Sequence, residues 1–152
     1  RMRLADILGQ VGAWAPKAVQ MAVAALLDAP ENIRDFSVTM KTKVKERLDA
    51  LHDGILAMKR DGLPVDAIVP QGAIYLSVRF DLIGRAAFGE QLRTNEDIRK
   101  LLLNHAGLAV VPFQAFGLKA DTGWFRLSVG AVSMPDIHQG LARVRDAVLA
   151  AH

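Results

Sequence analysis

The chain has 152 residues, of which 51% are hydrophobic and 23% are charged, a balance typical of a globular protein rather than a disordered one. It contains no cysteine, which excludes disulfides, thiolate nucleophiles and cysteine-based metal sites, and we expect a cytoplasmic location. The formal net charge is only +3, basic residues are interspersed with acidic ones, and no apolar run approaches the roughly 20 residues of a membrane span, so neither a nucleic-acid nor a membrane partner is expected.

The first residues, Arg1 to Asp6, have no signal-peptide layout and no initiator methionine, and we therefore expect a fragment or a cleaved product. Residues 4–9 are interpreted as the end of a helix. A second helix is predicted from Lys17 to Leu27, because Pro16 suits the first helical position, where its missing N–H has no cost. This helix is rich in alanine, which allows close packing against a neighbour.

Residues 31–60 predict one long helix, which ends at the Asp61-Gly62-Leu63-Pro64 run. Its apolar side chains recur every three or four residues, and the charged side chains on the opposite face are expected to be solvated. The apolar positions are Ile33, Phe36, Met40, Val44, Leu48, Leu51, Ile55 and Met58.

The C-terminal half predicts short strands and two helices. Extended segments are expected at 65–69, 72–80, 108–111 and 122–130. Thr94 and Ser133 are predicted to cap the two helices, and Gly107 is predicted to end the first in a left-handed conformation. The buried stripe of the last helix is predicted to consist of Ile137, Leu141, Val144, Val148 and Leu149. The pattern of residues 81–93 is ambiguous, with Gly84 and Gly89 favouring a loop that contains a helical turn, and residues 113–123 are interpreted as a loop. This order predicts an α+β fold, with helices covering a small, mostly antiparallel sheet.

The segment 122–130 places an arginine in the middle of a strand pattern. Phe125, Leu127 and Val129 alternate with Trp124, Arg126 and Ser128, which predicts one apolar face. A guanidinium stays protonated and offers a planar fork of donors that fits a carboxylate. The residues alone leave three alternatives open for Arg126: a carboxylate-binding site, a solvent-facing position on an edge strand, or a buried ion pair.

Four motifs follow one another at regular distances in this half of the chain. They are Pro70-Gln71-Gly72-Ala73-Ile74-Tyr75, Leu101-Leu102 through Gly107, Val110-Val111-Pro112 through Phe116-Gly117, and Phe125-Arg126-Leu127-Ser128. Together they resemble the C-terminal part of class I/II aminotransferases, the aspartate-aminotransferase-like enzymes of fold type I that use pyridoxal 5'-phosphate (PLP). The run from Gly12 to Gln20 resembles the family segment that follows the cofactor lysine, so the resemblance covers essentially the whole chain.

The resemblance implies a division of the chain and a function. Residues 1–30 would be a remnant of the large cofactor-binding domain and an interface segment, with Trp14 at the subunit interface. Residues 31–152 would be the C-terminal small domain, which the long helix links to the large one. The full-length protein would be a homodimeric aminotransferase that moves an amino group between an α-amino acid and an α-keto acid, with Arg126 binding the substrate α-carboxylate.

No catalytic or cofactor-binding residue is predicted within the chain. None of its lysines lies in the serine-rich, small-residue context of a Schiff-base lysine, and by the resemblance the other PLP-binding residues lie upstream. We therefore do not expect PLP to be bound to this fragment, nor the fragment to be active alone. The four histidines have no metal-ligand spacing, so no metal site is predicted either.

Gln114 departs from the family pattern, because many relatives have small residues after the proline of the Val-Val-Pro motif. This departure leaves the shape of the side-chain pocket open. Two alternatives to an aminotransferase also stay open: a non-catalytic α+β interaction module, and another fold type I PLP enzyme.

Overall fold

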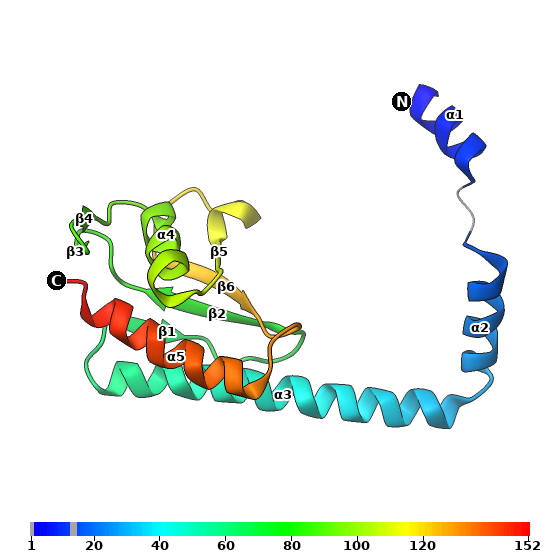
Figure 1. Ribbon diagram of the computed structural model, residues 1–152, viewed down its shortest axis with the longest axis horizontal. Coiled ribbons are helices and arrows are strands. Elements are labelled where there is room, and N and C mark those ends of the chain that lie inside the picture. Colours follow the sequence, from blue (N-terminus) through cyan, green and yellow to red (C-terminus); the bar gives the residue numbers. More distant parts are fainter. Residues whose placement is uncertain (1, 13–14) are drawn as a thin grey trace. The chain divides into compact units, whose positions relative to one another are not determined.

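The computed structural model describes residues 2–12 and 15–152 (Figure 1). The chain divides into two compact units, Arg1–Lys41 and Thr42–His152. The first unit contains α1 (Met2–Val11), α2 (Lys17–Leu27) and the beginning of α3 (Pro30–Arg60). α2 has the predicted bounds, and α1 extends beyond the predicted 4–9 at both ends. Trp14, the expected interface residue, lies outside the described residues.

The apolar side chains of α1 and α2 are exposed. α2 has no buried residue, so its alanine-rich surface stays available for packing against a neighbour. Among the described residues of the first unit, no other helix or strand covers α1 and α2. The exposed large side chains are Leu4, Ile7, Leu8 and Val11 of α1, and Val19, Met21, Val23, Leu26 and Leu27 of α2.

The long helix α3 is confirmed, but its apolar stripe is buried along only part of its length. The buried positions are Leu48, Leu51, Ile55 and Met58. Phe36 is 69% exposed and Met40 is also exposed, because they lie in the first unit, which has no covering layer of its own.

The second unit is built on a four-stranded sheet in the order β1-β2-β6-β5 (Figure 1). These strands are β1 (Val65–Ala67), β2 (Tyr75–Phe80), β6 (Trp124–Ser128) and β5 (Val111–Pro112). All three pairings are antiparallel, which confirms the predicted α+β architecture with a small antiparallel sheet.

The predicted strand 108–111 is confirmed only at Val111 and is wrong for 108–110, because only Val111 and Pro112 pair with the sheet. The N–H of Leu108 instead donates to the carbonyl of Leu102 and completes the end of the preceding helix. Val111 is 38% exposed, so the strand is not buried at this position. β5 is an edge strand, where a proline without an N–H is tolerated.

Residues 81–93 form a small hairpin rather than a loop with a helical turn. Its strands are β3 (Ala86–Ala87) and β4 (Glu90–Gln91). The two connecting residues, Phe88 and Gly89, have φ angles of 50° and 82°. Positive φ at both positions is the geometry that a two-residue hairpin turn requires.

Both predicted helix caps are confirmed. Thr94 precedes α4 (Asn95–Ala106) and exchanges hydrogen bonds with Asp97, and Ser133 precedes α5 (Met134–Leu149) in the same arrangement with Asp136. The hydrogen bond from the Thr94 hydroxyl lowers the pKa of the Asp97 carboxyl below its usual value.

The predicted end of α4 is confirmed, whereas the predicted buried stripe of α5 is corrected at one position. Gly107 ends α4 with φ 63°. On α5 the stripe prediction is wrong for Leu149, which is 59% exposed. Ala147 is buried instead, because it lies three residues after Val144 on the same helical face.

The buried residues of α3, α4 and α5 form one core cluster with the inner face of the sheet. The inner-face members are Leu76, Val78 and Phe80 of β2 and Phe125 and Leu127 of β6. α3 and α5 come close at Gly54, where a β-carbon would clash with the side chain of Leu141.

Candidate carboxylate-binding site

Arg126 lies on an interior strand of the sheet, not at its edge. β6 pairs with β2 on one side, where Ser77 is opposite Arg126, and with β5 on the other, where Val111 is opposite. Its chain neighbours Phe125 and Leu127 are buried in the core. The backbone of Arg126 is therefore held by strand pairing on both sides and by the burial of its chain neighbours in the core. The alternative of a solvent-facing position on an edge strand does not apply.

Two aromatic rings contact the Arg126 guanidinium. Its Cζ atom lies 4.2 Å from the centroid of the Tyr75 ring and 4.0 Å from that of Phe116. Tyr75 lies on β2, opposite Ser128 of β6. This register places the Tyr75 ring diagonally across from Arg126 on the same face of the sheet. Phe116 comes from η1 (Phe113–Phe116), a turn of 3-10 helix after β5. Contacts of this kind stabilise the cation and limit its rotation.

The guanidinium of Arg126 has no carboxylate partner among residues 2–12 and 15–152. Other arginines of the second unit do form ion pairs, such as Arg79 with Asp81 at 2.9 Å and Arg145 with Asp61 at 2.7 Å. Arg126 is only partly exposed, so the buried ion-pair alternative is not observed within the described residues. Its N–H donors therefore remain available to an external anion.

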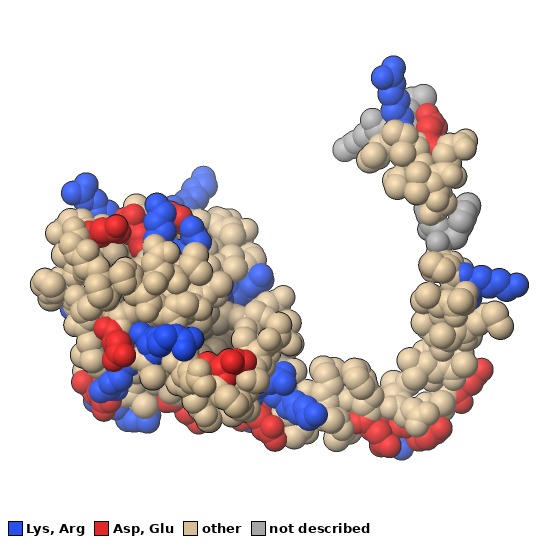
Figure 2. Space-filling model, in the orientation of Figure 1, with Lys and Arg blue, Asp and Glu red and all other residues tan. Residues whose placement is uncertain are grey.

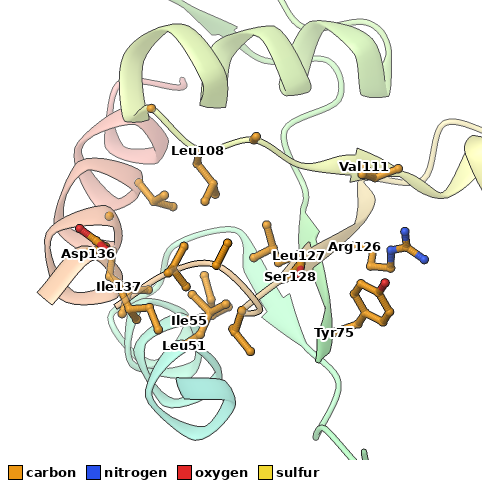
Figure 3. Close-up of a pocket in the computed structure, with 18 residues that line it drawn as sticks. Leu51, Ile55, Tyr75, Leu108, Val111, Arg126, Leu127, Ser128, Asp136 and Ile137 are labelled. Carbon is orange, nitrogen blue, oxygen red and sulfur yellow. The ribbon is translucent and has the colours of Figure 1, made fainter. Parts of the chain in front are cut away.

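A cavity of about 410 Å³ lies next to this arginine, with Arg126 and Tyr75 at its rim. Figure 3 shows both side chains on the far side of the strands from the apolar lining that includes Leu108 and Ile137. The lining carboxylate, Asp136, accepts a 2.6 Å hydrogen bond from the Ser133 hydroxyl as part of the helix cap. The arginine on the outer face of the sheet, rather than the apolar cavity, is thus suited to binding an anion.

Gln114 holds the loop between η1 and β6, a role that the sequence did not reveal. Its side chain accepts a hydrogen bond from Asn95 at 2.9 Å and donates to the carbonyl of Ala120 at 3.1 Å and to Asp121 at 2.9 Å. The sequence marked Gln114 only as a departure from a family pattern. The contact between Phe116 and Arg126 was also missed, because nothing in the spacing of the two residues indicates that they meet.

None of the described residues provides the setting that covalent binding of PLP requires. All seven lysines are exposed. Lys59 forms an ion pair with Asp66 at 2.8 Å, and Lys45 forms one with Asp49. A lysine that forms a Schiff base is activated by a desolvating pocket or by a neighbouring cation, and exposed lysines have no such pocket. The residues present therefore do not fit the covalent cofactor site.

Other kinds of site are also missing from the part of the chain that the structure describes. It shows no group of three or more histidine or acidic side chains able to hold a metal ion. No helix among these residues has the length and apolar character needed to cross a membrane. On the face of the second unit seen in Figure 2, lysines and arginines are interspersed with acidic side chains rather than gathered into one basic patch.

The fold and the site together define an α+β domain that presents a fixed arginine beside two aromatic rings on an open sheet face. Residues 4–144 match the family model "Aminotransferase class I and II". The chain belongs to this family. The family implies dependence on PLP, and the C-terminal part of a fold type I enzyme accounts for the architecture.

Two relatives and two solved structures show the extent of the similarity. The chain is 33% identical over 132 residues to the probable N-acetyl-LL-diaminopimelate aminotransferase of Bacillus subtilis, covering 87% of this chain and 30% of that protein. It is 34% identical over 127 residues to the aspartate aminotransferase of Rhizobium meliloti, covering 82% of this chain and 28% of that protein.

The crystal structure of the aspartate aminotransferase from Rhizobium meliloti matches with a TM-score of 0.67 and 29% identity, over 78% of this chain and 28% of that one. The aromatic aminotransferase of Pyrococcus horikoshii matches with a TM-score of 0.59 and 26% identity, over 76% of this chain and 28% of that one. The chain thus spans less than a third of the length of these relatives.

Proposed function

We propose that the chain works as the C-terminal part of a PLP-dependent aminotransferase that transfers an amino group between an α-amino acid and an α-keto acid. In this proposal Arg126 binds the substrate α-carboxylate through two parallel hydrogen bonds. The observation that carries it is the guanidinium on interior strand β6, in contact with Tyr75 and Phe116 and without a carboxylate partner among the described residues. A fixed anchor of this kind orients the substrate, and orientation is a large part of catalysis.

The remainder of the active site is supplied, in this proposal, by the part of the enzyme that the chain does not contain. PLP bound there supplies the electron sink for the chemistry. Arg126 contributes recognition rather than chemistry, because a guanidinium does not give up its proton. Tyr75 of β2 and Phe116 of η1 hold it in place.

The substitution Arg126→Lys in the full-length enzyme tests the assignment. Lysine keeps the charge but loses the planar fork, so one hydrogen bond to the carboxylate is lost. Charge-assisted hydrogen bonds contribute roughly 1.5–3 kcal/mol each, so kcat/KM for amino acids should fall on the order of tenfold to several hundredfold. Amines without a carboxylate should react as before.

Arg79→Lys is the matched control, because Arg79 lies on the same face of the sheet and pairs with Asp81. It should leave both classes of substrate unchanged. If Arg126→Lys lowers the turnover of amino acids and of carboxylate-free amines equally, or lowers neither, Arg126 has a structural role and the assignment is wrong.

We further propose that the 152-residue chain alone does not bind PLP covalently and is inactive. The exposure of all seven lysines supports this. Mixing the chain with PLP, reducing with borohydride and mapping the product should give no stoichiometric adduct at a single lysine. One such adduct would contradict the proposal.

We also propose that residues 1–30 belong to the large domain and subunit interface of a homodimer, and residues 31–152 to the small domain. The exposed apolar side chains of α1 and α2 support this, since surfaces of this kind are normally covered. Leu26→Glu in the full-length enzyme should weaken dimerisation in sedimentation measurements, whereas Leu103→Glu on α4 should not. Equal sedimentation of both variants and the parent would argue against the interface.

A further inference from the structure

Phe116 contacts Arg126 from an element that the core does not hold. η1 has only four residues and none of them is buried. Phe116 itself is exposed, and its ring meets Phe113 only edge to face, with centroids 6.2 Å apart. A single turn of 3-10 helix is not stable by itself. The Phe113 ring also lies 6.4 Å from the Trp124 ring on β6, which ties the first residue of η1 to the sheet. A further interaction, closer to Phe116 in the chain, adds to this contact.

The Gln114 side chain provides that interaction. Lying two residues before Phe116, it uses both ends of its amide, accepting from Asn95 and donating to the Ala120 carbonyl and Asp121. These partners lie on α4 and on the loop that returns to β6. η1 is thereby tied to two other parts of the second unit.

Asn95 connects the same network to the strand of the arginine. It is 1% exposed, and its Oδ1 atom accepts a 2.8 Å hydrogen bond from the N–H of Gly123 at the entrance to β6. The N–H of Asn95 donates to Asp121 at 2.7 Å. The network is anchored at the buried Asn95, whereas Gln114 and Asp121 keep access to solvent. Connected hydrogen bonds of this kind reduce the mobility of the segments that they join. One network thus fixes the segment before Phe116 and the segment before Arg126.

We propose that Gln114 is a positioning residue for substrate binding: through its hydrogen bonds to Asn95, Ala120 and Asp121 it holds Phe116 against Arg126 and so presets the guanidinium for the substrate carboxylate. This rests on the proposed function of Arg126. Tyr75 is fixed by the sheet, whereas Phe116 depends on Gln114. Without that constraint Arg126 must be ordered anew each time a carboxylate binds, which weakens binding without altering the chemical step.

The experiment compares Gln114→Met, Phe116→Leu and the double variant in the full-length enzyme. Methionine has a similar length but no hydrogen bonds, and leucine removes the ring. Each single change should raise KM for an α-amino acid roughly three- to tenfold with kcat changed less than about twofold, the range expected when one side chain must be ordered on binding. The double variant should be no worse than the worse single variant, because both changes remove the same constraint.

Two controls separate positioning from general damage. Gln91→Met makes the same chemical change on an exposed residue of β4 and should leave KM unchanged. kcat/KM for a carboxylate-free amine should be unaffected by every variant. If Gln114→Met does not fold, Gln114→Asn decides, because it keeps the amide but is too short to reach Asn95 and Asp121 together.

The outcomes also distinguish this proposal from the one it rests on. If Arg126→Lys weakens amino acid turnover selectively but Gln114→Met and Gln114→Asn do not raise KM, only the role of Gln114 is wrong. If the effects of Gln114→Met and Phe116→Leu multiply, or amines lose activity equally, the positioning role is likewise overturned. If Arg126→Lys shows no selectivity, the proposed function fails first.

Discussion

The two faces of strands β2 and β6 differ in composition and in burial. On the inner face, Phe80 and Phe125 are fully buried and their rings meet edge to face with centroids 6.0 Å apart. On the outer face, Tyr75, Arg126 and Ser128 all retain access to solvent. The inner face fixes the position of the backbone, which leaves the outer face free to hold a cation for binding. Stability and recognition are thus separated across a single sheet.

The largest expected effect concerns the inner face. Phe125→Ala removes a fully buried ring from the core and should lower the free energy of unfolding by roughly 3–5 kcal/mol. Urea unfolding followed by circular dichroism measures it. A loss below about 1 kcal/mol would mean that the inner face does not carry the stability that this comparison assigns to it.

A smaller effect on stability is expected at the beginning of α4, next to Asn95 of the hydrogen-bond network. Thr94→Ala removes the capping hydroxyl, and the free energy of unfolding should fall by roughly 0.5–2 kcal/mol. Ser77→Ala on the outer face of β2 serves as a control without a capping role. Equal unfolding midpoints for the two variants would contradict the contribution of the cap.

The same cap predicts a dependence on pH. The pKa of Asp97 is lowered in the folded state, first by the hydrogen bond from Thr94. Its contribution to stability is therefore complete above the unfolded-state pKa of about 4 and is lost as the pH falls through the lower, folded-state pKa. Urea titrations between pH 6 and about 2.5 should show a shallower decline for Thr94→Ala than for the parent. If the free energy of unfolding fell equally with pH in both proteins, groups other than Asp97 would cause the acid sensitivity.

The smallest effect on stability is expected for the site itself. Arg126→Met removes the cation but keeps an apolar stem beside the two rings, so the free energy of unfolding should change by less than about 1 kcal/mol. A larger loss in the same urea experiment would show that Arg126 stabilises the fold. The separation of the two faces would then be incomplete.

The sequence predicted the features that depend on local pattern. Thr94 and Ser133 were recognisable as caps because the acidic residue three positions later completes the motif. The strand carrying Arg126 was recognisable from its alternation, which the burial of Phe125 and Leu127 confirms. These caps and this alternation depend only on residues close in the sequence, and the tertiary structure does not change them.

Features that depend on distant partners could not be predicted. The apolar spacing of α3 is the same at Phe36 and at Ile55, yet only Ile55 is buried, because burial depends on what lies opposite. Leu108 was assigned to a strand by its apolar neighbours, but its N–H completes the end of α4 instead. The contact between Phe116 and Arg126 forms because the loop between η1 and β6 folds back on itself. The spacing of residues in the sequence does not indicate such a contact.

The close approach of α3 and α5 at Gly54 has a consequence for the tolerance of the chain to substitution. Glycine weakens a helix interior by about 1 kcal/mol relative to alanine, so Gly→Ala in a helix is ordinarily a stabilising change. At Gly54 the new methyl group would clash with the end of the Leu141 side chain, which would have to repack. The gain in helix propensity at Gly54 is therefore offset by the repacking of Leu141, and a propensity-guided redesign of α3 has to treat the two positions together.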